Sequence, residues 1–135
     1  MNKILLLILL GAASVCSSQV IFEEAFESTT IPVEWEIVSN ATDGGWQVGS
    51  SNELSSDNFQ IESNGTRLAG TNDDTCNCDK NNEALITKAI DLSNFPAAVL
   101  SFDLYYGNQS YNGLTESAMV QISTDKMNWT TLEVL

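Results

Sequence analysis

Apolar and polar residues alternate in short segments along this chain. In residues 100–104, Leu100, Phe102 and Leu104 alternate with Ser101 and Asp103. Because successive side chains of a strand point to opposite faces, this alternation predicts a strand with one apolar face. Comparable patterns predict strands at residues 20–26, 33–37, 45–48, 66–69, 84–90, 118–122 and 129–135.

Turn-forming residues separate these segments. Gly, Asn, Asp and Ser are concentrated in residues 39–44, 49–58, 64–65, 107–113 and 124–128. No segment carries the apolar period of a long helix, and residues 49–58 are polar enough to form a loop. Many short strands joined by such turns are typical of an all-β domain, and we expect an antiparallel β-sandwich of jelly-roll type.

The first 18 residues have the order of a secretory signal peptide. A basic residue is followed by an uninterrupted aliphatic run at residues 4–10 and then by small residues. The run is shorter than the about 20 residues that a membrane-spanning helix needs. We therefore expect cleavage before Gln19 and a secreted or cell-surface protein, in which residues 19–135 form one domain without membrane insertion. The alternative is a lipid on Cys16, which the bulky Val15 disfavours.

Charge and the absence of histidine exclude several classes of protein. The 135-residue chain has a net charge of −13, and removal of residues 1–18 leaves four basic and eighteen acidic side chains. Such a surface repels nucleic acid and anionic membranes, because both are recognised through Lys and Arg. Without histidine, the chain has no Ser-His-Asp or Cys-His catalytic site.

The most distinctive segment is residues 72–83, which combines four carboxylates, four amides and two cysteines. Its oxygens suit calcium, which takes about six to eight of them from carboxylates, amides and carbonyls. The alternative is an Asx-rich turn whose side chains bond to their own backbone. In an oxidising compartment we expect a disulfide between Cys76 and Cys78, because no other cysteine remains after export.

Other acidic and aromatic residues are weaker candidates for a site. Glu23 and Glu27 would lie about 13 Å apart on one strand, farther than the about 5–9.5 Å between the paired carboxyl groups of glycosidases. No other acid pair stands out, so we do not expect an enzyme. Asp103 lies opposite the apolar face of its strand, where it either faces water or binds a cation. Tyr111, in a loop rich in Gly and Asn, is the best candidate for stacking against a ligand.

Several segments together resemble a known group of secreted bacterial modules. They are Phe26-Glu27-Ser28 with Pro32 and Trp35, Gly44-Gly45-Trp46, residues 72–79, residues 85–93, residues 100–106 and residues 120–129. Through their order and spacing, the chain is similar to the MAM-like jelly-roll modules named cleaved-adhesin and choice-of-anchor J domains. This resemblance implies a calcium-bearing β-sandwich for adhesion or substrate docking, with Glu27, Asn72, Asp73 and Asp103 as calcium ligands.

The resemblance also implies that the closing strands of the sandwich are missing, because modules of this kind continue beyond the position of Leu135. We therefore expect an incomplete domain that binds an extracellular protein or carbohydrate. The alternative is an accessory domain of a larger secreted peptidase or other hydrolase. The full reading frame would discriminate between these two functions.

Overall fold

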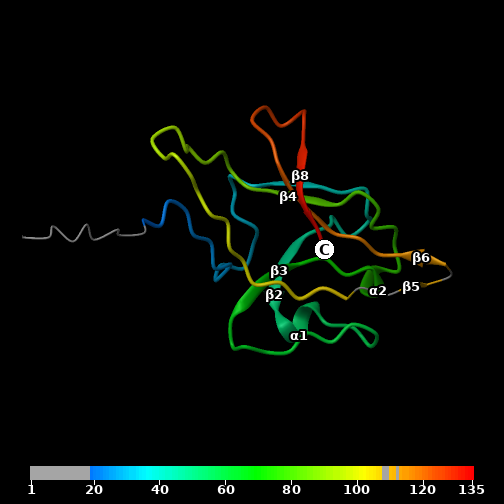
Figure 1. Ribbon diagram of the computed structural model, residues 1–135. Helices are drawn as coiled ribbons and strands as arrows, with labels where there is room; N and C mark the ends of the chain where they lie inside the picture. The colour runs from blue at the N-terminus through cyan, green and yellow to red at the C-terminus, as the bar shows by residue number, and fades with distance from the viewer. Residues whose placement is uncertain (1–18, 108–109, 112) are drawn as a thin grey trace, which may run out of the picture.

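The computed structural model describes residues 19–107, 110–111 and 113–135. The predicted signal peptide, residues 1–18, lies outside the described residues. The described chain contains eight short strands and two four-residue helices (Figure 1). In chain order, the elements are β1 Glu36–Val38, β2 Gln47–Ser50, α1 Ser51–Leu54, β3 Arg67–Gly70, α2 Asp73–Cys76, β4 Ala84–Ile86, β5 Ser110–Tyr111, β6 Leu114–Thr115, β7 Met119–Ile122 and β8 Thr130–Val134.

The described strands pair only in antiparallel fashion. They form four two-stranded sheets, β1 with β4, β2 with β3, β5 with β6, and β7 with β8. The β1–β4 pair joins the segments farthest apart in sequence, with Ile37 opposite Leu85. The prediction of a β-rich, antiparallel fold is therefore confirmed. Within the described residues, the four sheets do not join into a closed sandwich.

Six of the eight predicted strands are present with shifted or shortened ends, and two predictions are wrong. Residues 20–26 end at Phe26, whose φ of +55° leaves the β region, and its N–H bonds to Glu24 Oε1 at 2.6 Å instead of to a strand. Residues 100–104 belong to no described strand, and none of the described backbone–backbone hydrogen bonds involves residues 99–105. Alternation thus did not show whether these segments have a partner strand.

The loop predicted at residues 49–58 contains α1, which corrects that prediction. Ser50 Oγ accepts a hydrogen bond from Glu53 N at 3.3 Å, and the Glu53 carboxylate accepts one from Ser50 N at 2.7 Å. This capping box satisfies backbone N–H groups that otherwise have no partner in the first helical turn. The Ser50 N–H also holds the pKa of Glu53 below its ordinary value. No helix in the described ranges combines the length and apolar character needed to cross a membrane.

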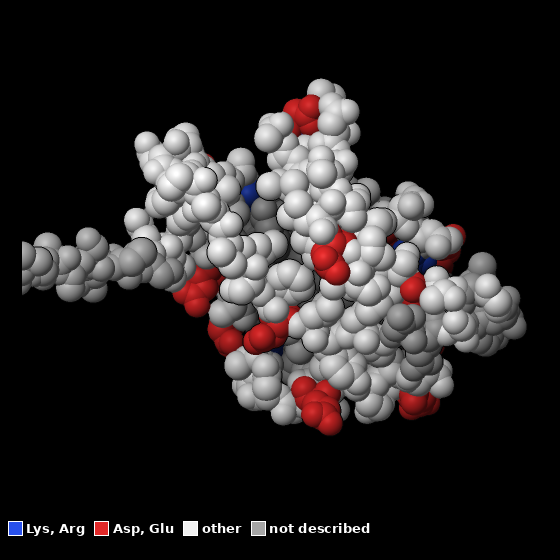
Figure 2. Space-filling view, in the orientation of Figure 1, with Lys and Arg blue, Asp and Glu red and all other residues white. Residues whose placement is uncertain are grey.

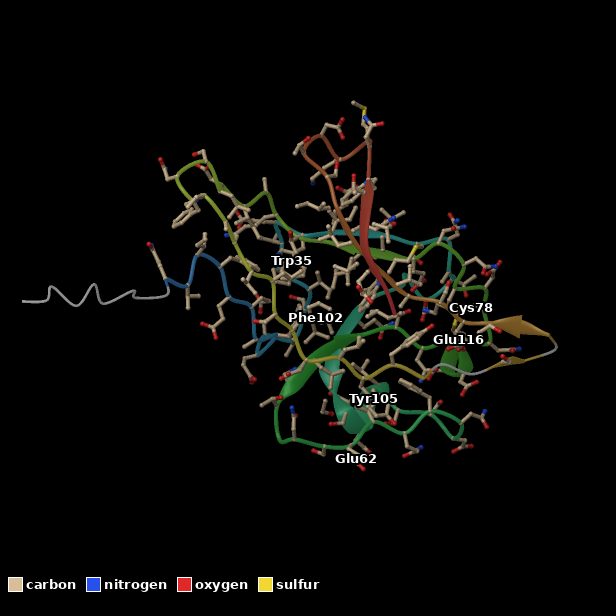
Figure 3. The ribbon with its side chains drawn as sticks, viewed as in Figure 1. Trp35, Glu62, Cys78, Phe102, Tyr105 and Glu116 are labelled. Carbon is tan, nitrogen blue, oxygen red and sulfur yellow. A yellow bond between two sulfur atoms is a disulfide. The ribbon has the colours of Figure 1, made fainter. Side chains whose placement is uncertain are left out.

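Apolar side chains in this fold are only partly covered, and none of those described is fully buried. Trp35 packs against Phe22 and Phe26 with ring centroids 5.9 and 5.5 Å apart, and Phe59 packs against Tyr105 at 5.2 Å (Figure 3). Offset and edge contacts of this kind stabilise aromatic pairs beyond the area that they bury. The packing is therefore centred on small aromatic groups, and much apolar surface stays exposed elsewhere.

The β7–β8 hairpin is closed by a turn that is built on Asp125. The Asp125 carboxylate accepts hydrogen bonds from the backbone N–H groups of Met127 at 2.8 Å and Asn128 at 2.7 Å. These bonds, led by the one from Asn128, hold the pKa of Asp125 far below its ordinary value of 3.8. The ionised carboxylate therefore fixes the turn.

We expect acid to loosen this hairpin. Because the folded pKa of Asp125 is lowered, its contribution to stability is fully present above its ordinary pKa of 3.8 and is lost as the pH falls below that value. Amide protection in β8 should therefore fall below about pH 4. Asp125→Asn should lower that protection already at neutral pH, whereas Asp57→Asn, at an exposed position outside the turn, should not. Equal protection in wild type and Asp125→Asn would contradict this role.

Candidate functional site

The acidic loop begins with a helical turn that Asn72 caps. The Asn72 side chain accepts a hydrogen bond from Asp74 N at 3.0 Å and donates one to Leu54 O at 3.0 Å. A side-chain oxygen at this position satisfies one of the free N–H groups of α2. The Asx-type interpretation of this loop is thus correct for Asn72, although its oxygen keeps a second lone pair.

Cys76 and Cys78 form the disulfide that the sequence predicts. Asn77 lies between them in the left-handed region, with φ 47° and ψ 48°, and its N–H bonds to Asp73 O at 2.7 Å. Asparagine tolerates this conformation better than most residues. The left-handed residue ends α2 and brings the two cysteine Cα atoms to 5.1 Å. Both cysteines are half-buried.

A second loop brings Asp43 to the disulfide. Gly44 and Gly45 both have positive φ, and Gly45 N donates to Asp43 Oδ1 at 3.0 Å. A Cβ atom on Gly45 would lie 2.6 Å from Cβ of Ser39, so only glycine fits there. Asp43 Oδ1 lies 4.0 Å from Cys78 Sγ, although 35 residues separate them in sequence.

Lys80 holds the Asp43 carboxylate in place. Its ammonium lies 2.7 Å from both Asp43 oxygens, and the lysine side chain is only 12% exposed. The hydrogen bond from Lys80, followed by the one from the Gly45 N–H, holds the pKa of Asp43 below its ordinary value. Asp43 is therefore ionised and oriented beside the two sulfur atoms.

Glu83 connects this site to the rest of the fold. Its side chain is 4% exposed and accepts hydrogen bonds from the hydroxyls of Ser39, at 2.6 Å, and Thr71. Lys80 Nζ lies 3.7 Å away. Ser39 follows β1, Thr71 follows β3 and Glu83 precedes β4, so one carboxylate joins three parts of the chain.

Glu116 adds a carboxylate that sequence reasoning did not place here. Burial raises its pKa, and the nearby carboxylates of Asp73 and Asp74 raise it further. Burial, together with Glu116, likewise raises the pKa of Tyr106, whose hydroxyl has no hydrogen-bond partner among the described groups. Forty-two positions separate Glu116 from Asp74, so no spacing rule could have found this proximity.

The predicted calcium ligands lie in different surroundings. Glu27, Asp73 and Asp103 are exposed, and Asn72 is half-buried at the start of α2. Among the described His, Cys, Asp and Glu residues, the group whose ligand atoms meet within 4.8 Å consists of Asp43, Cys76 and Cys78. Calcium binding by the predicted set stays a prediction. Tyr111, the predicted ligand-stacking residue, belongs to β5, and its side chain is outside the described part of the structure.

Two hollows mark the surface of the described residues. A small one of about 40 Å³ lies beside the acidic loop, and its lining includes Asp43, Glu53 and Asn72. The larger one is a groove of about 340 Å³, which we call the apolar groove. It is lined by Leu100, Phe102, Val120, Leu132, Glu133 and Leu135.

The apolar groove lies between residues 100–102 and the β7–β8 hairpin. Leu100, Phe102 and Leu132 are 65%, 52% and 56% exposed. Figure 2 shows carboxylates scattered over the visible face, with only small basic spots between them. The lining of the apolar groove, which includes one charged residue, therefore differs from the acidic surface of the rest of the molecule.

Comparison of the chain with protein-family models, curated proteins and solved structures gives no match. The similarity to MAM-like modules therefore remains a prediction from the sequence segments that carry it.

Proposed function

We propose that this protein is an extracellular binding module of the antiparallel β-sandwich class, which recognises an extended segment of a partner protein. The observation that carries this proposal is the apolar groove. Large exposed apolar surfaces are rare on soluble monomers except where a partner binds. The leader-like order of residues 1–18 supports an extracellular location.

The backbone beside the groove supports an extended segment as the partner. Residues 99–105 take part in none of the described backbone–backbone hydrogen bonds, so their N–H and C=O groups are open to a strand. Addition of a strand supplies main-chain hydrogen bonds, while alternate side chains fill pockets. Because the chain carries a net charge of −13, and Glu133 lines the groove, the partner segment should be neutral or basic.

Peptides displayed on phage test this function. Selection on the protein in calcium should enrich segments that alternate apolar residues and carry Lys or Arg. Phe102→Ser should weaken their binding by about 30-fold, since loss of a central interface residue costs about 2 kcal/mol. Val33→Ser is the matched control, because Val33 is 97% exposed and lies outside the groove. Equal binding by wild type and Phe102→Ser would refute the groove as the binding site.

We also propose that calcium stabilises the module at its acidic loop. The hollow of about 40 Å³ beside Asn72 supports this, because three of its lining residues, Asp43, Glu53 and Asn72, carry side-chain oxygens of the kind that calcium binds. Burial first, and then the carboxylates of Asp73 and Asp74, raise the pKa of Glu116, and a cation nearby would offset the second effect.

Calcium at about 10 mM should raise the melting temperature. Extracellular sites have dissociation constants of up to about 10⁻³ M, so this concentration would stabilise the folded state by about 1.4 kcal/mol, or about 5 °C. Asp73→Asn, in the acidic loop, should reduce the shift, whereas Asp57→Asn should not. Identical thermal melts in calcium and in chelator, measured by circular dichroism, would remove calcium from this account.

A further inference from the structure

The group formed by Asp43, Cys76 and Cys78 combines two sulfur atoms with a carboxylate. Calcium does not bind sulfur, and a permanent disulfide has no use for the carboxylate. Its ligand atoms lie within 4.8 Å of one another, and both cysteine residues are half-buried. We propose that reduction of the Cys76–Cys78 disulfide converts this group into a site for a soft divalent cation such as zinc, with Asp43 as the third protein ligand.

The spacing between Asp43 and Cys78 is close to that of two ligands of a tetrahedral metal. Zinc bonds to sulfur at about 2.3 Å and to carboxylate oxygen at about 2.1 Å, which places a sulfur and an oxygen ligand about 3.6 Å apart. Asp43 Oδ1 and Cys78 Sγ are 4.0 Å apart. The left-handed Asn77 lies between the two cysteines, and their sulfur atoms lie within 4.8 Å of an Asp43 oxygen. After reduction, two thiolates and this carboxylate would bind the ion, and water would complete the coordination.

The surroundings of Asp43 orient it for this role. Gly45 N–H donates to Oδ1, while Lys80 Nζ lies 2.7 Å from each oxygen. Hydrogen bonds to a ligating carboxylate fix its orientation and strengthen metal binding. Two thiolates and a carboxylate around a divalent ion leave one negative charge, which the Lys80 ammonium offsets. Thiolate sulfur selects zinc or cadmium over calcium, because calcium takes only oxygen ligands.

A dithiol is the reductant for the Cys76–Cys78 disulfide. The dithiol transfers two electrons and two protons to the Cys76–Cys78 bond and leaves as its own disulfide. On metal binding, both new thiols release their protons to solvent, and the thiolates bond to the ion.

The two states would hold the fold together differently. The disulfide closes a ring between neighbours only two positions apart, so it adds little constraint to the unfolded chain. The metal would instead join the acidic loop to Asp43, 35 positions from Cys78. Closing a longer loop removes more entropy from the unfolded chain. The reduced, metal-bound protein should therefore melt at a higher temperature than the reduced protein without metal.

Cadmium titration of the full chain tests the site, because cadmium–thiolate bonds absorb in the ultraviolet. Protein reduced with a non-chelating phosphine should bind one cadmium ion, and oxidised protein should bind none at this site. Asp43→Asn should weaken binding at least about tenfold, and Asp43→His, which supplies a new ligand, should restore it. Asp57→Asn is the control for a lost surface charge.

Several outcomes would overturn the proposal. Reduced protein without the cadmium–thiolate absorbance has no such site. Equal affinities of wild type and Asp43→Asn would mean that the two thiolates alone hold the ion. If Asp43→Asn unfolds, the cadmium affinities of Asp43→His and wild type are compared instead. A weaker affinity of Asp43→His would place residue 43 outside the coordination sphere.

Discussion

Replacing Glu83 with alanine is expected to lower the free energy of unfolding by about 2–3 kcal/mol. The Glu83 carboxylate is 4% exposed and accepts hydrogen bonds from Ser39 and Thr71, with Lys80 Nζ at 3.7 Å. Truncation would leave the hydroxyls of Ser39 and Thr71 without their acceptor and would remove one of the two carboxylates near Lys80 Nζ. Lys80 keeps its contact with Asp43 in this variant. The expected loss of unfolding free energy is therefore smaller than for breaking an isolated buried ion pair.

Urea denaturation of three variants measures this effect. Glu83→Gln retains an acceptor oxygen of the same size and should lose less stability than Glu83→Ala. Glu62→Ala removes an exposed glutamate, labelled in Figure 3, and should stay within about 0.5 kcal/mol of wild type. If Glu83→Ala and Glu62→Ala unfold at the same urea concentration, the carboxylate of Glu83 does not connect the three chain segments as described.

The sequence predicted the local features of the acidic loop well. Cys76 and Cys78 form the expected disulfide, and Asn72 bonds to the nearby backbone as an Asx residue does. Both features depend on residues within a few positions of each other, where side-chain type and backbone geometry decide the outcome. Local chemistry of this kind can be read directly from a sequence.

The long-range features of the site could not be predicted. Asp43 reaches Cys78 across 35 positions and Ser39 reaches Glu83 across 44, and neither pair has a spacing that marks it. The pairing of β1 with β4 places Ser39 next to this region, but strand pairing depends on tertiary packing that a single sequence does not encode in any short pattern. The composition of the loop therefore pointed to a site, while the fold supplied half of its residues.

The strand prediction at residues 100–104 was wrong for a related reason. Residues 100–104 have the clearest alternation in the chain, yet they form no strand and pair with none of the described strands. Alternation indicates that one face of a segment is apolar, but it does not indicate which element covers that face. In this structure Leu100 and Phe102 of this segment line the groove instead of a closed interior.

The same exposed surface predicts self-association of residues 19–135. All five residues of β8 are exposed, and in the described chain β8 pairs only with β7, so its outer edge is open. Unpaired strand edges template pairing with other chains. The segment from Trp129 to Leu135 carries a single charge, Glu133, and has high β-propensity. We therefore expect oligomers and a broad thermal transition at micromolar concentration.

Light scattering coupled to size-exclusion chromatography tests this expectation. Leu132→Lys should shift the protein toward the monomer, because a charge at the centre of the exposed strand opposes pairing of two identical edges. Val33→Lys adds the same charge at an exposed valine away from β8 and should leave the distribution unchanged. A monomeric wild-type protein with a sharp, cooperative melt would contradict the prediction. Such a result would mean that a stable single domain can expose this strand edge and the apolar groove to water.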